Sequence, residues 1–300
     1  MRRVQLVTPE RFQWLEGYYN ELSKQYEVVI KTIPEVGNWD CIIFLWTNQD
    51  TIKFINDNPK ICKYIVYIRR YEFFGLIHSV QWDKVDEIVF VNNYLKNKFE
   101  EHFNKKTNLI YNGVNPSKWT YREHSAGVNI AMVGWINQKK NFPLAMQILK
   151  RLGNRYKLHI AGGFQDEATL MYISYFAEQN KLNNIIFYGR IKDMNSWLEN
   201  KDYILSCAIS EGCPNNVIEA MAKGIKPVVH NWPGATEQFD NNNIFTVPDE
   251  AAAMIEDTYY DSIHYRKTVE EKFGLSSYTQ LRKLVNKCLG ENNETKIPNA

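Results

Sequence analysis

Residues 210–224, with the sequence SEGCPNNVIEAMAKG, constrain the fold of this chain more than any other segment. They follow a short apolar run, residues 203–209, that predicts a buried strand. Pro214 suits the first turn of a helix, and Gly224 suits the position just after a helix ends. The segment therefore predicts a strand, a loop and a helix. A helix start of this kind presents free N–H groups and a positive dipole end, which together favour phosphate.

Two carboxylates flank this predicted helix start. Glu211 lies in the loop, and Glu219 lies eight residues later, inside the helix. Taken alone, two such glutamates are ordinary groups on a solvated face. Paired carboxylates also suggest the acid and nucleophile of a glycosidase. The helix start between them favours a ligand that carries phosphate instead.

The C-terminal half alternates short apolar runs with helical segments. This alternation predicts a parallel sheet with helices on both faces. Such sheets bind ligands beyond the carboxyl ends of their strands. The expected strands are residues 129–133, 157–161, 185–188, 203–209, 226–230 and 244–247, and the expected helices are 143–152, 167–180, 194–200 and 215–223.

The N-terminal half also alternates, less regularly. The turn-forming residues 112–116, NGVNP, predict a boundary between domains 1–113 and 114–275. A last helix is expected at 276–289, and the polar tail 291–300 is expected to be frayed. The expected N-terminal strands are 3–7, 28–31, 41–45, 64–68, 87–91 and 108–111, and the expected helices are 11–25 and 93–103.

The composition is that of a globular enzyme with two domains of ordinary size. The chain has 300 residues and a net charge of +2, which gives no general attraction to nucleic acid. No apolar run is long enough for a transmembrane helix, and the start lacks the apolar core of a signal peptide. The five cysteines show no metal-ligand spacing, which favours a reducing cytoplasm and argues against a zinc site.

The pattern EGxPxxxxEAMAxGxxPVV at residues 211–229 resembles the donor-site signature of retaining GT-B glycosyltransferases, the "glycosyl transferases group 1" family. The resemblance continues through the turn at 112–115. It implies two Rossmann-like domains facing a central cleft, with a shortened acceptor-side N-terminal domain. It also implies that the last helix, 276–290, crosses back to pack on the N-terminal domain; the alternative is a helix that stays with the C-terminal domain. It also implies that Glu211 contacts the transferred sugar and that Glu219 binds the ribose. The diphosphate would lie at the helix start, formed by Gly212, Asn215, Asn216 and Val217.

Residues 134–141 resemble the first loop of the donor domain in that family. There an arginine follows the glycine, and a lysine lies five positions further on. Lys140 matches this lysine, and a cation here would stabilise charge on the leaving phosphate. Trp135 stands where the family has its arginine, next to Gly134. Either Lys139 or another cation replaces that arginine, or turnover is weakened. The alternative for Lys140 is a solvated surface lysine.

Three further loops of this half follow predicted strands. Gly162 and Gly163 would let the backbone approach the nucleotide. Arg190 either contacts phosphate or base, or forms a surface salt bridge. His159, within a strand, is expected to be a packing residue. Glu237 either binds a hydroxyl or starts a helix, where an acidic residue favours the dipole.

On the acceptor side, residues 69–72 follow a predicted strand where the family often has a His-x-x-Glu pattern. Glu72 fits the glutamate, whereas Arg69 replaces the histidine. A guanidinium stays protonated and cannot act as a general base, but it can bind an anionic acceptor. His78 either replaces the missing histidine or is a surface residue.

The resemblance implies a retaining glycosyltransferase with a nucleotide-diphosphate sugar as co-substrate. No paired-aspartate metal motif occurs, so we expect turnover without a metal or other cofactor. An epimerase or a phosphorylase on the same fold is one alternative. A non-catalytic sugar-nucleotide-binding or scaffold subunit is another, because Trp135 and Arg69 depart from the family pattern.

The expected acceptor is a cell-surface glycan or glycolipid, with a role in polysaccharide biosynthesis, and the expected location is cytoplasmic. Helix 93–103 and the residues after it are basic and aromatic. This segment either contacts the inner face of a membrane peripherally or packs on its own sheet with solvated lysines. The residues concerned are Tyr94, Lys96, Lys98, Phe99, Phe103, Lys105 and Lys106.

Overall fold

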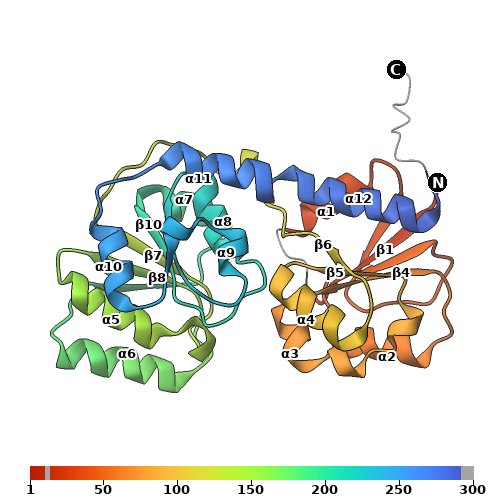
Figure 1. Cartoon of the computed structure of the whole chain (residues 1–300), viewed down its shortest axis with the longest axis horizontal. Helices are drawn as coiled ribbons and strands as arrows, with labels where there is room; N and C mark the ends of the chain where they lie inside the picture. Colours follow the sequence, from red (N-terminus) through yellow and green to blue (C-terminus); the bar gives the residue numbers. More distant parts are fainter. Residues whose placement is uncertain (11–13, 292–300) are drawn as a thin grey trace. The chain divides into compact units, whose positions relative to one another are not determined.

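The computed structural model describes residues 1–10 and 14–291. The chain divides into two compact units, one of residues 1–113 with 275–300 and one of residues 114–274. Each unit is an α/β layer structure around a six-stranded parallel sheet (Figure 1), as the sequence predicts. The start of the predicted helix 11–25 and nearly all of the predicted tail 291–300 lie outside the described residues.

The sheet of the N-terminal unit has the strand order β2-β1-β3-β4-β5-β6. Its central strands are continuous apolar runs: all four residues of CIIF in β3 are buried, as expected for a sheet covered on both faces. The predicted strand 108–111 is shorter than expected. The strands are β1 (Arg3–Val7), β2 (Glu27–Lys31), β3 (Cys41–Phe44), β4 (Lys63–Ile68), β5 (Glu87–Phe90) and β6 (Asn108–Leu109).

Helices cover both faces of this sheet. In Figure 1, α1 and α12 lie on one face and α2, α3 and α4 lie on the other. The last helix, α12, is held by the ion pair of Arg282 with Glu21 at 2.8 Å. The hydroxyl of Tyr278 also donates to the carbonyl oxygen of Gly113 at 2.7 Å. The sequence did not predict α2 or α3. The helices are α1 (Leu15–Leu22), α2 (Gln49–Asp57), α3 (Arg70–Gly75), α4 (Asn93–Phe103) and α12 (Leu275–Leu289).

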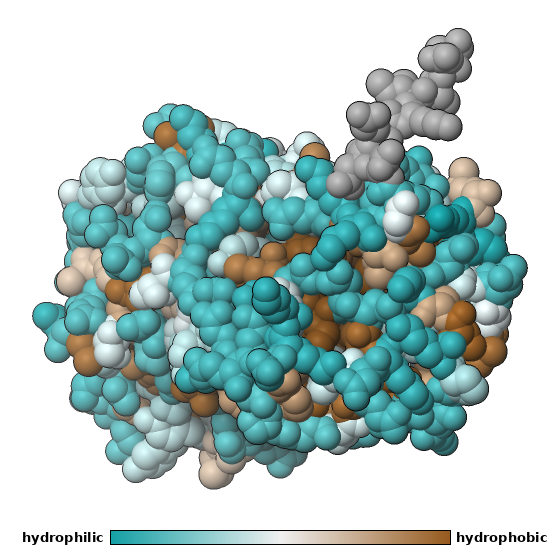
Figure 2. Space-filling view, turned by 45° about the vertical axis from the view of Figure 1, so that its right-hand side comes forward, coloured by the Kyte–Doolittle hydropathy of each residue, from teal (hydrophilic) through white to brown (hydrophobic). Residues whose placement is uncertain are grey.

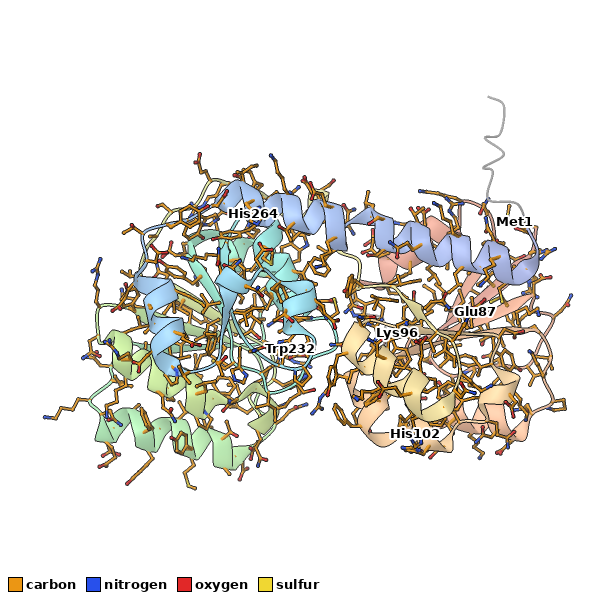
Figure 3. The ribbon with its side chains drawn as sticks, in the orientation of Figure 1. Met1, Glu87, Lys96, His102, Trp232 and His264 are labelled. Atoms are coloured by element: carbon orange, nitrogen blue, oxygen red, sulfur yellow. The ribbon has the colours of Figure 1, made fainter. Side chains whose placement is uncertain are left out.

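Helix α4 turns its aromatic face to its own sheet. Phe99 is fully buried, and Phe103 is partly buried against the same core. Lys96, seen on α4 in Figure 3, pairs with Glu100 at 2.9 Å. Lys98 and Lys105 likewise pair with Glu101 and Asp83. The structure therefore favours the packing interpretation of this helix.

The sheet of the C-terminal unit has the order β12-β11-β10-β7-β8-β9. The chain direction across the sheet reverses between β7 and β10, the switch point at which open parallel sheets bind ligands. The predicted strands 203–209 and 244–247 end earlier than expected. The strands are β7 (Asn129–Val133), β8 (Lys157–Ala161), β9 (Ile185–Gly189), β10 (Tyr203–Ser206), β11 (Lys226–His230) and β12 (Ile244–Phe245).

In this unit α5 packs with α6 and α10, and α8 packs with α11. These two groups lie on opposite faces of the sheet in Figure 1. Helix α8 begins directly after Pro214 and is followed by Gly224 at φ +90°, as its sequence predicts. The helices are α5 (Phe142–Leu152), α6 (Glu167–Gln179), α7 (Met194–Trp197), α8 (Asn215–Ala222), α9 (Ala235–Gln238), α10 (Pro248–Glu256) and α11 (Ser262–Thr268).

Three segments of this unit differ from the prediction or were not predicted. The expected helix 194–200 consists of α7 and a separate 3₁₀ turn, Leu198–Asn200. Helices α10 and α11, with the π-helical segment Val269–Phe273 after α11, were not predicted.

Hydrophilic residues cover most of the face shown in Figure 2, with hydrophobic residues in smaller patches between them. Among residues 1–10 and 14–291, no helix is both long enough and apolar enough to cross a membrane.

Candidate functional site

The loops after β7 and β10 meet at the switch point of the C-terminal sheet. The backbone N–H of Ile209 donates to the carbonyl oxygen of Lys139 at 3.1 Å. From the first turn of α8, the side-chain amide of Asn216 donates to the carbonyl oxygen of Val133 at 2.8 Å. Adjacent parallel strands end at the same edge, so these bonds fix the two loops against each other and against the start of α8.

Glu211 lies at the centre of this junction and is only 8% exposed. Its carboxylate pairs with the ammonium group of Lys140 at 2.8 Å and with that of Lys139 at 3.0 Å. Burial by itself would raise the pKa of Glu211, but the charges and hydrogen bonds of Lys140 and Lys139 lower it below its usual value. The carboxylate is therefore ionised at neutral pH, and it holds both lysines beside the helix start.

Two glycines let the backbone approach this junction closely. Gly134 has φ +135°, and Gly162 has φ +153°, both in the region that side chains rarely adopt. A Cβ atom on Gly134 would lie 2.7 Å from Cε of Lys140, and one on Gly162 would overlap the carbonyl oxygen of Gly134. Side chains at either position would displace the loop that carries Lys140.

Glu219 lies on α8 in a different environment. Its side chain is partly exposed, and within the described residues its carboxylate has no hydrogen bond or ion pair. Burial raises the pKa of Glu219 to about 8. Protonation is therefore favoured at neutral pH, in contrast to Glu211. An unpartnered, largely desolvated carboxyl group is costly and is commonly associated with a functional site.

The other predicted residues of the helix start are held in place by the loop itself. The carbonyl oxygen of Gly212 accepts a hydrogen bond from the side-chain amide of Gln238 at 2.7 Å. The N–H of Val217 donates to the carbonyl oxygen of Pro214 at 3.1 Å, and Val217 is fully buried. Asn215 is the first residue of α8. The N–H group of Val217 is thus already engaged within the turn.

A pocket of about 540 Å³ adjoins these loops. Trp135, which is 40% exposed, forms part of its wall, and the guanidinium of Arg190 lies over the indole at 4.4 Å from the ring centroid. The sequence did not predict this contact, because the two residues are far apart along the chain. The pocket is lined by Val133, Gly134, Trp135, Ala161, Gly162, Gly163, Arg190, Ile191, Lys192 and Met194.

His159 lies in the middle of β8, and Glu237 lies in α9, which follows β11. His159 is 7% exposed and contacts the hydroxyl of Tyr188 at 2.9 Å and the side-chain oxygen of Asn129 at 3.1 Å. Burial lowers the pKa of His159 to about 4, so the imidazole is neutral. Glu237 lies in the first turn of α9, with Oε2 buried and without a hydrogen-bond partner. His159 is thus a packing residue, as predicted.

In the N-terminal unit, Arg69 and Glu72 lie where β4 ends and α3 begins. Glu72 is fully buried and accepts hydrogen bonds from the backbone N–H groups of Arg69 and Thr47. Burial raises the pKa of Glu72 to about 6. This capping arrangement gives Glu72 a structural role. Arg69 donates to the carbonyl oxygen of Leu45 and to Asn112, and its Nη2 is buried without a hydrogen-bond partner.

His78 does not join Arg69. Its ring lies 5.0 Å from that of His102 and 5.6 Å from that of Phe103, at the C-terminal end of α4. Helix α4 starts near the carboxyl end of β5 and is 11 residues, about 16 Å, long. His78 therefore lies towards the opposite edge of the sheet and is exposed, which favours the alternative of a surface residue. Figure 3 shows His102 and Lys96 at opposite ends of α4.

Among residues 1–10 and 14–291, no group of three or more His, Cys, Asp and Glu side chains is placed to hold a metal ion.

Solved glycosyltransferase structures share this fold. One is HepE of Anabaena, crystallised with UDP and glucose. Its alignment covers 96% of this chain and 100% of the HepE chain, with a TM-score of 0.77 and 12% sequence identity. A glycosyltransferase of Rickettsia africae matches 97% of this chain over 99% of its own, with a TM-score of 0.72 at 15% identity. These likenesses show the GT-B fold that the sequence predicts.

Comparison of the sequence with known proteins identifies the family of this chain. An uncharacterized glycosyltransferase of Methanocaldococcus jannaschii is 27% identical over 146 residues, which are 48% of this chain. The matched region is only 39% of that relative's length. The family model for "Glycosyl transferases group 1" matches residues 121–272, just over half of the 300 residues, including the loops after β7 and β10. The chain therefore belongs to the glycosyl transferases group 1 family.

Proposed function

We propose that this glycosyltransferase transfers a sugar from a nucleotide-diphosphate donor with retention of anomeric configuration. The observation that carries the proposal is the buried Glu211 with its two lysines at the switch point, next to the start of α8. Family membership and the UDP complexes of HepE support a donor of this kind. We propose a cell-surface glycan or glycolipid as the acceptor and the cytoplasm as the location.

In this proposal the diphosphate lies between Lys140 and the first turn of α8. The ammonium group of Lys140 and the positive end of the helix neutralise charge that develops on the leaving phosphate. Glu211 keeps Lys139 and Lys140 in place, and in this proposal its carboxylate also contacts hydroxyl groups of the sugar.

Glu219 is proposed to bind the ribose. Its carboxylate is largely desolvated and has no partner within the described residues, so two ribose hydroxyls would supply the missing donors. The nearby pocket of about 540 Å³ has a mostly aliphatic and glycine lining and would hold the base. These three contacts would place the sugar beside Glu211.

Transfer without a metal ion follows from the same arrangement. Lysine and helix dipole supply positive charge at the point where a metal would otherwise act. We therefore propose metal-independent turnover.

The first prediction concerns donor binding. In a thermal-shift screen against UDP-, GDP-, ADP- and CMP-sugars, we expect at least one donor to raise the melting temperature. Glu219→Ala should abolish that rise because the ribose loses its acceptor. Glu178→Ala is the matched control, since Glu178 is an exposed glutamate on α6 of the same unit. An undiminished rise with Glu219→Ala would refute the ribose role.

The second prediction concerns the products. NMR of the reaction on an acceptor library should show free nucleoside diphosphate and a glycosylated product with the donor's anomeric configuration.

The rate should be unchanged in excess EDTA. Lys140→Ala should lower kcat by roughly 10²–10³, as loss of one stabilising donor does elsewhere. An inverted product would contradict retention, and loss of activity in EDTA would contradict metal independence.

The third prediction uses the pKa of Glu219, raised from 4.5 to about 8. Below pH 4.5 the side chain is protonated in folded and unfolded chains, and Glu219→Gln should change stability little. Between pH 4.5 and 8 the unfolded chain releases this proton while the folded chain still holds it, so the wild-type fold loses stability across that window and keeps the loss above pH 8. Without donor, Glu219→Gln should therefore melt higher than wild type at pH 9.

Calorimetry at pH 5 and pH 9 checks this, with Glu178→Gln as the exposed control. A melting-temperature difference between wild type and Glu219→Gln that is equal at both pH values would show that Glu219 is not buried as described.

A further inference from the structure

The lysines beside α8 leave a shortage of positive charge for a diphosphate. Lys139 and Lys140 both pair with Glu211, so the three side chains together carry one net positive charge. A diphosphate carries several negative charges, and its charge increases as the bond to the sugar breaks. A further cation at this edge of the sheet would therefore strengthen the site.

Arg190 is a cation without a carboxylate partner in the part of the chain that the structure describes. Within the described residues its guanidinium has neither an ion pair nor a hydrogen bond, and its Cζ lies over the Trp135 ring, 4.4 Å from the ring centroid. A guanidinium over an indole is held by the ring's negative face, and this contact uses none of its hydrogen-bond donors. The stack therefore orients Arg190 without using its hydrogen-bond donors.

The indole itself has little freedom to move. Trp135 directly follows Gly134, and a Cβ atom on Gly163 would lie only 2.6 Å from the ring. The indole fits in this position only because residue 163 has no side chain. Trp135 is a fixed platform that bridges the loops after β7, β8 and β9.

Trp135 and Arg190 line the same pocket as Val133 and Gly134. The carbonyl oxygen of Val133 is held by Asn216 of α8, and Gly134 packs against the side chain of Lys140. The pocket therefore shares a wall with the proposed phosphate position. A nucleotide with its base in this pocket would carry its diphosphate along that wall.

We propose that Arg190 binds the diphosphate of the donor, and that Trp135 is the positioning residue that holds its guanidinium there. The inference rests on the proposed function. It assigns to the loop after β9 a positive charge that Lys139 and Lys140 cannot supply, because Glu211 neutralises half of the charge of these two lysines.

The test compares UDP with uridine, which lacks the phosphates. UDP is titrated by calorimetry and uridine by NMR into the millimolar range, with GDP and ADP and their nucleosides in parallel. Arg190→Ala should weaken UDP binding by about tenfold or more and weaken uridine binding much less, because uridine lacks the phosphates. Trp135→Leu should also weaken UDP binding by about tenfold or more, with some loss of uridine binding because the indole lines the base pocket. Trp135→Phe, which keeps an aromatic face, should retain most of the affinity.

Arg155→Ala is the matched control. Arg155 also stacks on an aromatic ring of this unit, that of Tyr156 at 5.8 Å, but it lies outside the pocket lining. UDP affinity should not change in this variant.

Two results would overturn the inference. Equal losses for UDP and uridine in Arg190→Ala would place the guanidinium at the base. Unchanged UDP affinity in Arg190→Ala, with binding still lost in Glu219→Ala, would remove Arg190 from the site while the proposed function stands. Failure of all three nucleoside diphosphates to bind the wild type would count against the proposed function itself.

Discussion

The buried ion pairs of Glu211 with Lys139 and Lys140 are the interaction on which the rest of the site depends. A carboxylate this deeply buried is unfavourable unless cations and hydrogen bonds compensate its lost solvation. Removing one lysine would leave uncompensated charge, and removing Glu211 would leave two ammonium groups repelling each other. The pairs therefore link the loop after β7 to the loop after β10 and fix both lysines beside α8.

Three glutamates show how local surroundings give one residue type different roles. Lysine charges lower the pKa of Glu211, whereas burial raises that of Glu72 to about 6 and that of Glu219 to about 8. Glu72 accepts backbone N–H groups and caps a helix. Glu219 has neither lysines nor backbone donors within the described residues, and this makes it the best suited of the three to receive hydroxyl groups from a ligand.

Local patterns predicted most of the C-terminal unit. Apolar runs predicted the parallel strands, and Pro214 with Gly224 predicted the limits of α8. Strand formation and helix ends could be predicted because they depend on residues that are close together in the sequence. Local patterns could not reveal that Arg190 stacks on Trp135 or that His78 lies beside His102. Those contacts join segments distant in sequence and exist only after the sheet has formed.

A crystal structure with a bound nucleoside diphosphate sugar tests the central claim most directly. The account predicts phosphate oxygens within hydrogen-bond distance of the Lys140 ammonium group and of backbone N–H groups at the start of α8. It also predicts ribose hydroxyls on the carboxyl group of Glu219. A diphosphate bound away from Lys140 and α8, with Glu219 still unpartnered, would contradict it.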